Sequence, residues 1–352
     1  MLLIDAHLDL AYNAINLGRD LVATVTEGRL RAIETSAEWR DHAGTLTTTW
    51  PEIRTHAPAV VCGTIFILPE AASTSLEGAA YATPEEAREQ AWAQVEWYGQ
   101  MAAAGHCRLI TSQAQLEAVC AEAPPYGPPG LVLLMEGADG LLAPDELGRW
   151  HAAGLRWLGP AWQGTRYCGG TMVPGPLTAL GIELIGEMDR LAVALDVSHL
   201  AEESFWQALA LFRGPVAASH ANCRALLGPD QAQRFLSDAM IQAIVERDGV
   251  IGLALYNKML VNPWDERKES VALADLVRHI EHVCALAGST RHVAIGSDLD
   301  GGFGLEAIPA ELNTWGDLAK IGDALQDAGW QPADIANVLG ANWRRWLGRA
   351  LG

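Results

Sequence analysis

LLIDAHLD, residues 2–9, is an apolar run that ends in a histidine and an aspartate, and it sets the expectation for the whole chain. Side chains of a β-strand alternate between its two faces, so residues two positions apart point the same way. His7 and Asp9 therefore lie on one side of a strand, at the point where it ends. An imidazole and a carboxylate presented together suit a divalent metal ion, although such a pair is weak evidence by itself.

Seven further apolar runs follow, with helical or loop segments between them. They are continuous rather than alternating, as expected of parallel strands that are buried on both faces. The runs cover residues 60–68, 131–137, 155–162, 193–199, 215–220, 249–255 and 292–300. A ninth short run, CRLIT at 107–111, is assigned outside this set as an edge strand or connector.

Amphipathic helical patterns separate most of the runs. They lie at residues 85–105, 177–192, 204–212, 237–249 and 271–288. Strand and helix alternating eight times predict an α/β protein of the (β/α)8 TIM-barrel class. Because no break in composition marks a boundary, residues 1–352 are expected to form a single barrel domain.

Two kinds of segment remain outside the repeating pattern. Residues 313–351 are predicted to form two extra C-terminal helices that close the barrel. Three segments rich in Gly, Pro, Thr and polar residues are predicted to be loops, and the first is long enough to cover the barrel mouth. These segments are 18–56, 69–84 and 121–130.

The composition indicates which kinds of binding partner and which cellular compartment to expect. The chain has 24 basic and 43 acidic residues, a formal net charge of −19. Nucleic acids and anionic membranes bind through clustered Lys and Arg, so neither is expected as a partner. The sequence shows neither a signal peptide nor the ~20 apolar residues of a membrane span, so a cytoplasmic protein is expected. The six cysteines form no C-x-x-C pair and are expected to be reduced and buried.

Ionisable residues stand at the ends of five predicted strands. They are His7, Asp9, Glu136, His199, His220 and Asp298. The carboxyl ends of barrel strands converge on the active site, so these side chains are expected to face one cavity. Each alone has a structural explanation, such as a turn or a cap, but six buried polar groups are costly unless they are paired or metal-bound. Their chemistry favours zinc or a similar divalent ion.

The stretches around these residues occur together in one known family. They are DAHLD, LLMEGAD, ALDVSHL, VAASHANCRAL, the segment from LSD to IVERDGVIGLALY, DLVRHIEHV and VAIGSDLDGG, in this order between residues 5 and 302. With them the sequence resembles the membrane (renal-type) dipeptidase family, zinc metallopeptidases within the amidohydrolase-like barrels. The resemblance implies a hydrolase that cleaves the peptide bond of small dipeptides.

The resemblance also implies two zinc ions per chain. His7 and Asp9 would bind one ion, and His199 and His220 would bind the other. Glu136 would bridge them. Two metal ions held close together can share a hydroxide and polarise a carbonyl group.

Further residues match the family's catalytic and substrate-binding positions. Asp298 matches the catalytic aspartate, which would move a proton from the bridging water to the leaving amine. Arg234 aligns with the arginine that holds the substrate carboxylate, which a guanidinium fits bidentately. Tyr256 matches a tyrosine that lines the pocket. Arg224, in ANCRAL, is the other candidate for a positive charge near the barrel mouth. We expect Arg224 to have a structural role instead.

The sequence departs from the family pattern at two places. The animal enzymes carry a histidine in a T-L-T-H run after the fourth strand, and it is thought to stabilise the oxyanion; here the run is G-P-A-W and ends in Trp162. Tryptophan donates only through its indole N–H, so that role would pass to a metal or weaken, or Trp162 would simply wall the substrate pocket. The second departure is Phe235 after Arg234, where the family usually has asparagine.

Other functions remain open at this stage. The same metal array could open a lactone, hydrolyse another small amide or deaminate a ring, because pocket shape decides the substrate. A barrel that has lost its chemistry and binds a ligand is a further alternative, although no ligand residue is missing. The sequence leaves the oligomeric state open, and the resemblance alone makes a homodimer one option.

Overall fold

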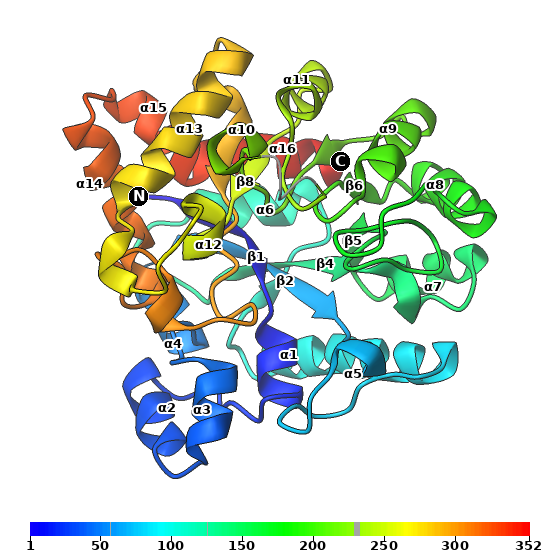
Figure 1. The fold of residues 1–352 in the computed structure, drawn as a ribbon, viewed down its shortest axis with the longest axis horizontal. Coiled ribbons are helices and arrows are strands. Elements are labelled where there is room, and N and C mark those ends of the chain that lie inside the picture. Colours follow the sequence, from blue (N-terminus) through cyan, green and yellow to red (C-terminus); the bar gives the residue numbers. More distant parts are fainter. Residues whose placement is uncertain (57, 125, 229–232) are drawn as a thin grey trace.

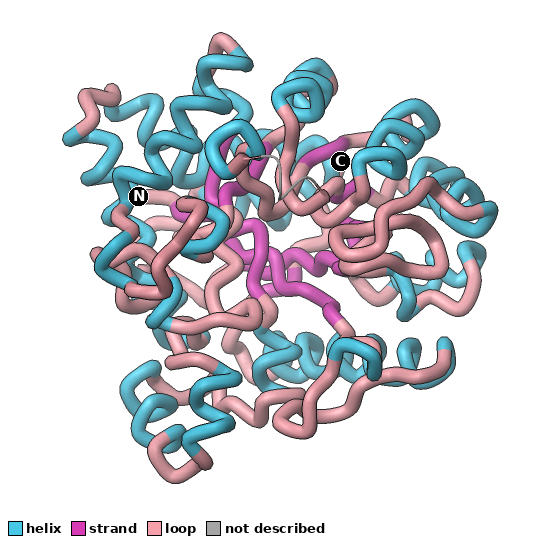
Figure 2. Tube along the Cα trace, viewed as in Figure 1, coloured by secondary structure: helices cyan, strands magenta, loops and turns pink. Residues whose placement is uncertain are grey.

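The computed structural model describes residues 1–56, 58–124, 126–228 and 233–352 of the chain. Figure 1 shows strands in the middle of the molecule and helices around them. The same arrangement is visible in Figure 2, where the strands form one central group and the loops lie mainly outside it. Residue 125, within the predicted loop 121–130, lies outside the described residues.

Eight parallel strands form the barrel. They are β1 (Leu3–Leu8), β2 (Ala59–Phe66), β4 (Gly130–Glu136), β5 (Leu155–Gly159), β6 (Ala194–Asp196), β7 (Val216–Ala217), β8 (Ile251–Leu253) and β9 (Val293–Ile295). Their order is β7-β6-β5-β4-β2-β1-β9-β8. A parallel bridge between Ala218 and Ile251 joins the two ends of this order, so the barrel is nearly closed. The predicted barrel is confirmed.

The ninth short run also lies where it was predicted. β3 (Arg108–Leu109) pairs only with β4 and stays outside the ring. Several barrel strands are shorter than their apolar runs, because the backbone beyond them pairs with buried aspartate side chains. Asp196, for example, accepts the backbone N–H groups of Ser198 and Ser219 at 3.0 and 2.9 Å.

All five predicted helices are present, with slightly different ends. They are α5 (Pro84–Ala103), α8 (Ala179–Leu191), α9 (Glu202–Leu211), α11 (Asp238–Glu246) and α13 (Leu273–Ala287). Shorter helices complete the outer layer. They are α1 (Leu10–Ile15), α6 (Gln113–Cys120), α7 (Leu147–Ala152), α10 (Arg224–Leu227) and α12 (Asn257–Leu260).

The prediction of a loop over residues 18–56 is wrong. This segment contains α2 (Val25–Ala32), α3 (Ala37–Ala43) and α4 (Trp50–Thr55), and the first two lie at one side of the barrel in Figure 1. Each helix begins after a hydroxyl side chain that accepts a backbone N–H three residues on, at Thr24, Ser36 and Thr49. Such caps stabilise short helices even in a polar segment.

The last helix closes the amino-terminal end of the barrel. α14 (Lys320–Asp327) is followed by α15 (Pro332–Ala336), which continues through a π-helical segment into α16 (Asn342–Ala350). Trp343 and Trp346 of α16 pack against Trp157 among the inward-facing strand residues. Their indole N–H groups donate to strand carbonyls at 2.7 and 2.9 Å. Because α16 fills the amino-terminal end, the carboxyl end of the barrel is the end that can hold a functional site.

None of the helices in the described ranges has the length and apolar character needed to cross a lipid bilayer.

Candidate active site

The six ionisable residues predicted from the strand ends lie together at the carboxyl end of the barrel. His7 Nε2, at the end of β1, lies 3.2 Å from Glu136 Oε2. The same nitrogen lies 3.9 Å from Asp9 Oδ1 and 3.9 Å from Asp298 Oδ1. His7, Asp9 and Asp298 therefore form one group of candidate ligand atoms, and all three residues are buried.

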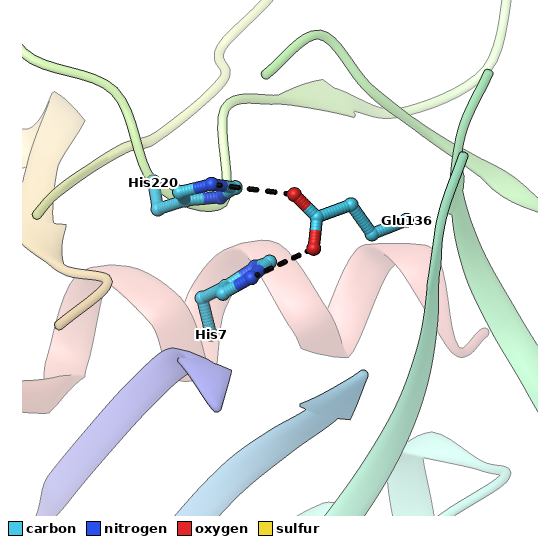
Figure 3. A group of neighbouring side chains, drawn as sticks. All are labelled: His7, Glu136 and His220. Carbon is cyan, nitrogen blue, oxygen red and sulfur yellow. Dashed lines mark ion pairs between the residues drawn. The ribbon is translucent and has the colours of Figure 1, made fainter. Parts of the chain in front are cut away.

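Glu136 stands between His7 on one side and the pair His199 and His220 on the other. Figure 3 shows His7 and His220 pointing at different oxygens of its carboxylate. Oε2 faces His7, whereas Oε1 lies 3.0 Å from His199 Nε2 and 3.6 Å from His220 Nε2. The two latter nitrogens are 2.9 Å apart. One carboxylate thus presents one oxygen to each group, which is the arrangement that a bridging ligand needs.

The buried charges influence one another strongly. Burial disfavours a charge on His7, but the Glu136 and Asp9 carboxylates raise its pKa to about 10. Burial and the nearby Arg234 guanidinium lower the pKa of His199 to about 4, and burial lowers that of His220 as well. Without a cation, His7 carries the compensating charge, so it must release a proton when a metal binds.

Two site residues adopt an unusual backbone conformation. His199 has φ 64° and Asp298 has φ 59°, both in the left-handed region. This region costs a non-glycine residue about 1–3 kcal/mol and is found preferentially at functional sites. The backbone N–H of Asp298 donates to the His7 carbonyl at 3.2 Å, which ties this turn to the end of β1.

The glycine-rich segment RYCGGT (166–171) supports His199. Thr171 Oγ1 lies 2.8 Å from His199 Nδ1, on the side of the ring away from Glu136. A Cβ on Gly169 or Gly170 would lie 2.3 or 2.6 Å from neighbouring backbone atoms, so only glycine fits there. Sequence reasoning missed Thr171, because nothing in the sequence indicates which hydroxyl faces a histidine.

Arg234 reaches the site with part of its guanidinium unpaired. Nη1 donates to the backbone carbonyl of His220 at 3.1 Å. Nε and Nη2 are buried, and neither has a hydrogen-bond partner among the described residues. Buried donors without partners are costly, so a carboxylate placed here would satisfy them. Arg224 differs, because its Nη1 pairs with Glu202 at 2.7 Å, in agreement with the structural role expected for it.

Aromatic side chains form the rest of the wall. Phe66 contacts Trp162 edge to face, with ring centroids 4.9 Å apart, and Tyr12 with centroids 5.1 Å apart. Tyr256 stacks on Phe303, with ring centroids 4.5 Å apart. Tyr12 and Phe66 were missed in the sequence, since an aromatic residue after a strand is equally typical of a core.

These residues surround one cavity of about 330 Å³. Its polar side is lined by Asp9, Glu136, His199, His220, Arg234 and Asp298. The cavity is also lined by the apolar or aromatic side chains of Tyr12, Leu17, Phe66, Leu68, Ala72 and Trp162, and by those of His42 and Glu77. The cavity has the size and the mixed lining of a site for a small molecule with both charged and apolar groups.

Known proteins are similar to this chain in sequence. The chain is 33% identical to an uncharacterized protein in the pqqA 5′ region of Klebsiella pneumoniae, over 73% of this chain and 93% of that protein. It is 29% identical to dipeptidase aclJ of Aspergillus oryzae, over 63% of this chain and 53% of that protein.

Solved structures share the fold. Dipeptidase AC, a metallopeptidase of family M19, superposes with a TM-score of 0.80 at 24% identity, over 100% of this chain and 99% of that one. A metallopeptidase from Rhodobacter sphaeroides, solved with a phosphinate mimic of the dipeptide L-Ala-D-Ala, gives 0.79 at 24% identity, over 99% of both chains. The family profile described as membrane dipeptidase, peptidase family M19, matches residues 1–350. This chain therefore belongs to the membrane dipeptidase family of metallopeptidases.

Proposed function

We propose that this protein is a dipeptidase that uses two zinc ions to hydrolyse small dipeptides. The main observation behind the proposal is that one carboxylate oxygen of Glu136 faces His7 and the other faces His199. His7 and Asp9 would hold one ion, His199 and His220 the other, and Glu136 would contact both. Membership of a metallo-dipeptidase family supports the same reaction.

The donor set fits zinc. Imidazole nitrogens and carboxylate oxygens are its usual ligands, and the histidines each direct Nε2 towards the Glu136 carboxylate. Ions bound here would activate water as the nucleophile and polarise the substrate carbonyl. Because His199 and His220 are neutral at physiological pH, both can donate a lone pair without first losing a proton.

Asp298 is proposed to move the proton. Burial raises the pKa of its carboxyl group well above the ordinary value, and the Asp9 and Glu136 charges act in the same direction. A carboxylate with a raised pKa accepts a proton more readily near neutral pH and can then pass it to the leaving amine. Its position 3.9 Å from His7 Nε2 keeps it beside the reacting groups.

Arg234 and the aromatic wall would orient the dipeptide. Arg234 lies beside His220, after β7, and in the barrel order β2 stands four places from β7, on the opposite side. β2 ends in Phe66, so a substrate with its carboxylate on Arg234 would extend its first residue towards the Phe66–Trp162 wall. In this proposal Trp162 walls the pocket, and Tyr256 lines it beside the carboxylate.

The proposal is tested by a panel of L-L and L-D dipeptides that differ in their first residue. Zinc-loaded protein should hydrolyse them, and chelator-treated protein should not. Dipeptides with Leu or Phe first should exceed those with Asp first by about 10-fold or more in kcat/KM, because only an apolar side chain gains by leaving water for the aromatic wall. Release of free amino acids measures each rate.

Two outcomes would count against parts of this proposal. No cleavage by protein that binds two metal ions would redirect the assignment to a lactone or another amide. A preference for a charged first residue would contradict the orientation towards the aromatic wall, while leaving the dipeptidase reaction in place.

Replacing Arg234 with methionine should raise KM for dipeptides by about 10- to 100-fold, the range expected for a lost hydrogen bond to a charged group. Dipeptides whose C-terminus is amidated should be affected much less, because they carry no carboxylate. Arg224→Met is the matched control, since that arginine pairs with Glu202, and its KM should stay near the wild-type value. Equal losses on both substrates would rule out the carboxylate contact.

A further inference from the structure

We propose that Ser219 is a positioning residue that orients one metal-ligand histidine in each of the two zinc sites. This inference rests on the two-zinc site proposed above. Ser219 is fully buried behind the site, directly before His220 in the chain. Its hydroxyl oxygen lies 2.9 Å from His220 Nδ1 and 3.3 Å from His7 Nδ1. These two histidines belong to different ions in the proposed site.

The surroundings of Ser219 determine where its proton goes. Its hydroxyl donates to Oδ2 of Asp196, a fully buried carboxylate at the end of β6. The other oxygen of Asp196 accepts the backbone N–H groups of Ser198 and Ser219, so it is held in one orientation. Because Oδ1 already accepts two backbone N–H groups, Oδ2 is the oxygen left to accept the serine proton.

Counting donors and acceptors then assigns the histidines. A hydroxyl group offers one proton and two lone pairs. Once the proton points at Asp196, the lone pairs of Ser219 face Nδ1–H of His220 at 2.9 Å and Nδ1–H of His7 at 3.3 Å, with the Ser198 hydroxyl at 3.2 Å as a third group able to donate. A neutral imidazole that carries its proton on Nδ1 leaves Nε2 free to bind a metal. One hydroxyl therefore prepares a ligand for each ion.

Ser198, the remaining polar neighbour of Ser219, holds His220 through a backbone hydrogen bond. Ser198 Oγ lies 3.2 Å from Ser219 Oγ and accepts the backbone N–H of His220 at 3.1 Å. The third histidine has a separate partner, because His199 Nδ1 faces Thr171 and not Ser219. Thr171 contacts a ligand of one proposed zinc site only. The effects of removing the Thr171 hydroxyl and the Ser219 hydroxyl can therefore be told apart by experiment.

A second buried aspartate–serine pair provides the matched control. Asp5 accepts the backbone N–H of Ser297 at 2.8 Å and its hydroxyl as well. Ser297 directly precedes Asp298, just as Ser219 precedes His220, and both serines are fully buried. The recorded side-chain partner of Ser297 is Asp5, and no imidazole of the described residues bonds to its hydroxyl. Removing this hydroxyl has the cost of a lost buried hydrogen bond without an effect on a histidine.

The test is a competition titration of zinc alone against a chromophoric chelator, with no dipeptide present. Ser219→Ala should weaken both zinc-binding steps by about 10- to 100-fold, the usual effect of losing a partner of a metal-bound histidine. Thr171→Ala should weaken one step only, and Ser297→Ala should change neither by more than about twofold. Ser219→Ala behaving like Ser297→Ala, or affecting a single step, would overturn the proposal.

A second readout examines the hydrogen bonds directly in the zinc-loaded protein. Imidazole N–H protons that are hydrogen-bonded and buried exchange slowly and give resolved downfield proton signals. Ser219→Ala should lose two such signals and Thr171→Ala one, and retention of all signals in Ser219→Ala would refute the assignment. Should Ser219→Ala fail to fold, Asp196→Asn, which replaces the carboxylate that accepts the Ser219 hydroxyl, should weaken the same two steps. Wild-type protein that binds no zinc would overturn the proposed function too, whereas two unaffected sites in Ser219→Ala overturn this inference alone.

Discussion

Asp298→Asn is expected to lower kcat by about 10²- to 10⁴-fold while the protein still binds two zinc ions, because general acid–base catalysis contributes this much. Asparagine keeps the size of the side chain but cannot carry the proton. Steady-state hydrolysis of a dipeptide, together with metal analysis of the same sample, measures both effects.

The backbone at Asp298 makes asparagine the right replacement. Asp298 has φ 59°, and asparagine is among the few residues that tolerate this left-handed conformation. Asp300→Asn is the control, because Asp300 has φ 63° and its carboxylate accepts the backbone N–H groups of Thr47 and Thr48. That variant should lose stability rather than turnover. Loss of a zinc ion in Asp298→Asn would instead identify Asp298 as a ligand, and normal turnover would remove its proton-transfer role.

Glu136→Gln is expected to weaken binding of both zinc ions and to abolish hydrolysis. The carboxylate is the anionic group placed between His7 on one side and His199 on the other, and an amide of the same shape carries no charge. A single substitution should therefore lower the affinity of two sites, by at least the 10- to 100-fold seen for a weaker perturbation of a metal site. Zinc content after dialysis and the residual rate of dipeptide hydrolysis check the result.

Glu77→Gln provides a comparison within the same cavity. Glu77 also lines the cavity, but its Oε1 pairs with His42 Nε2 at 2.9 Å, away from the proposed ligands. This variant should keep both zinc ions, so a loss in Glu136→Gln alone would reflect the position of the charge and not the total charge of the cavity. Wild-type zinc affinity in Glu136→Gln would contradict the bridging role.

The barrel was predictable because strands that are buried on both faces appear in the sequence as continuous apolar runs. A strand such as residues 131–135 must be apolar throughout, and such runs occur eight times with helices between most of them. The region 18–56 was mispredicted because its three helices are short and polar and depend on caps at Thr24, Ser36 and Thr49. The T-x-x-E pattern at Thr24 and Glu27 was the signal available for the first of them.

The identity of the site residues was also accessible from the sequence, since an ionisable group directly after a buried strand is rare without a partner. His7, Glu136 and His220 could be listed, and the barrel topology implied that they share one cavity. Their arrangement could not be predicted. Which oxygen of Glu136 faces which histidine depends on the register between β2 and β4 and on the left-handed backbone at His199.

The sequence alone thus determined the fold class and the set of candidate ligands, because both rest on local patterns of burial and residue type, and its motifs indicated the metallopeptidase family by resemblance. Only the tertiary structure decided that Ser219 lies between His7 and His220, that Thr171 supports His199, and that Phe66 and Arg234 line the same cavity from opposite sides of the barrel. These contacts join residues far apart in the chain, such as positions 7 and 219. A hydroxyl or an aromatic ring carries no local sign of the partner that folding brings to it.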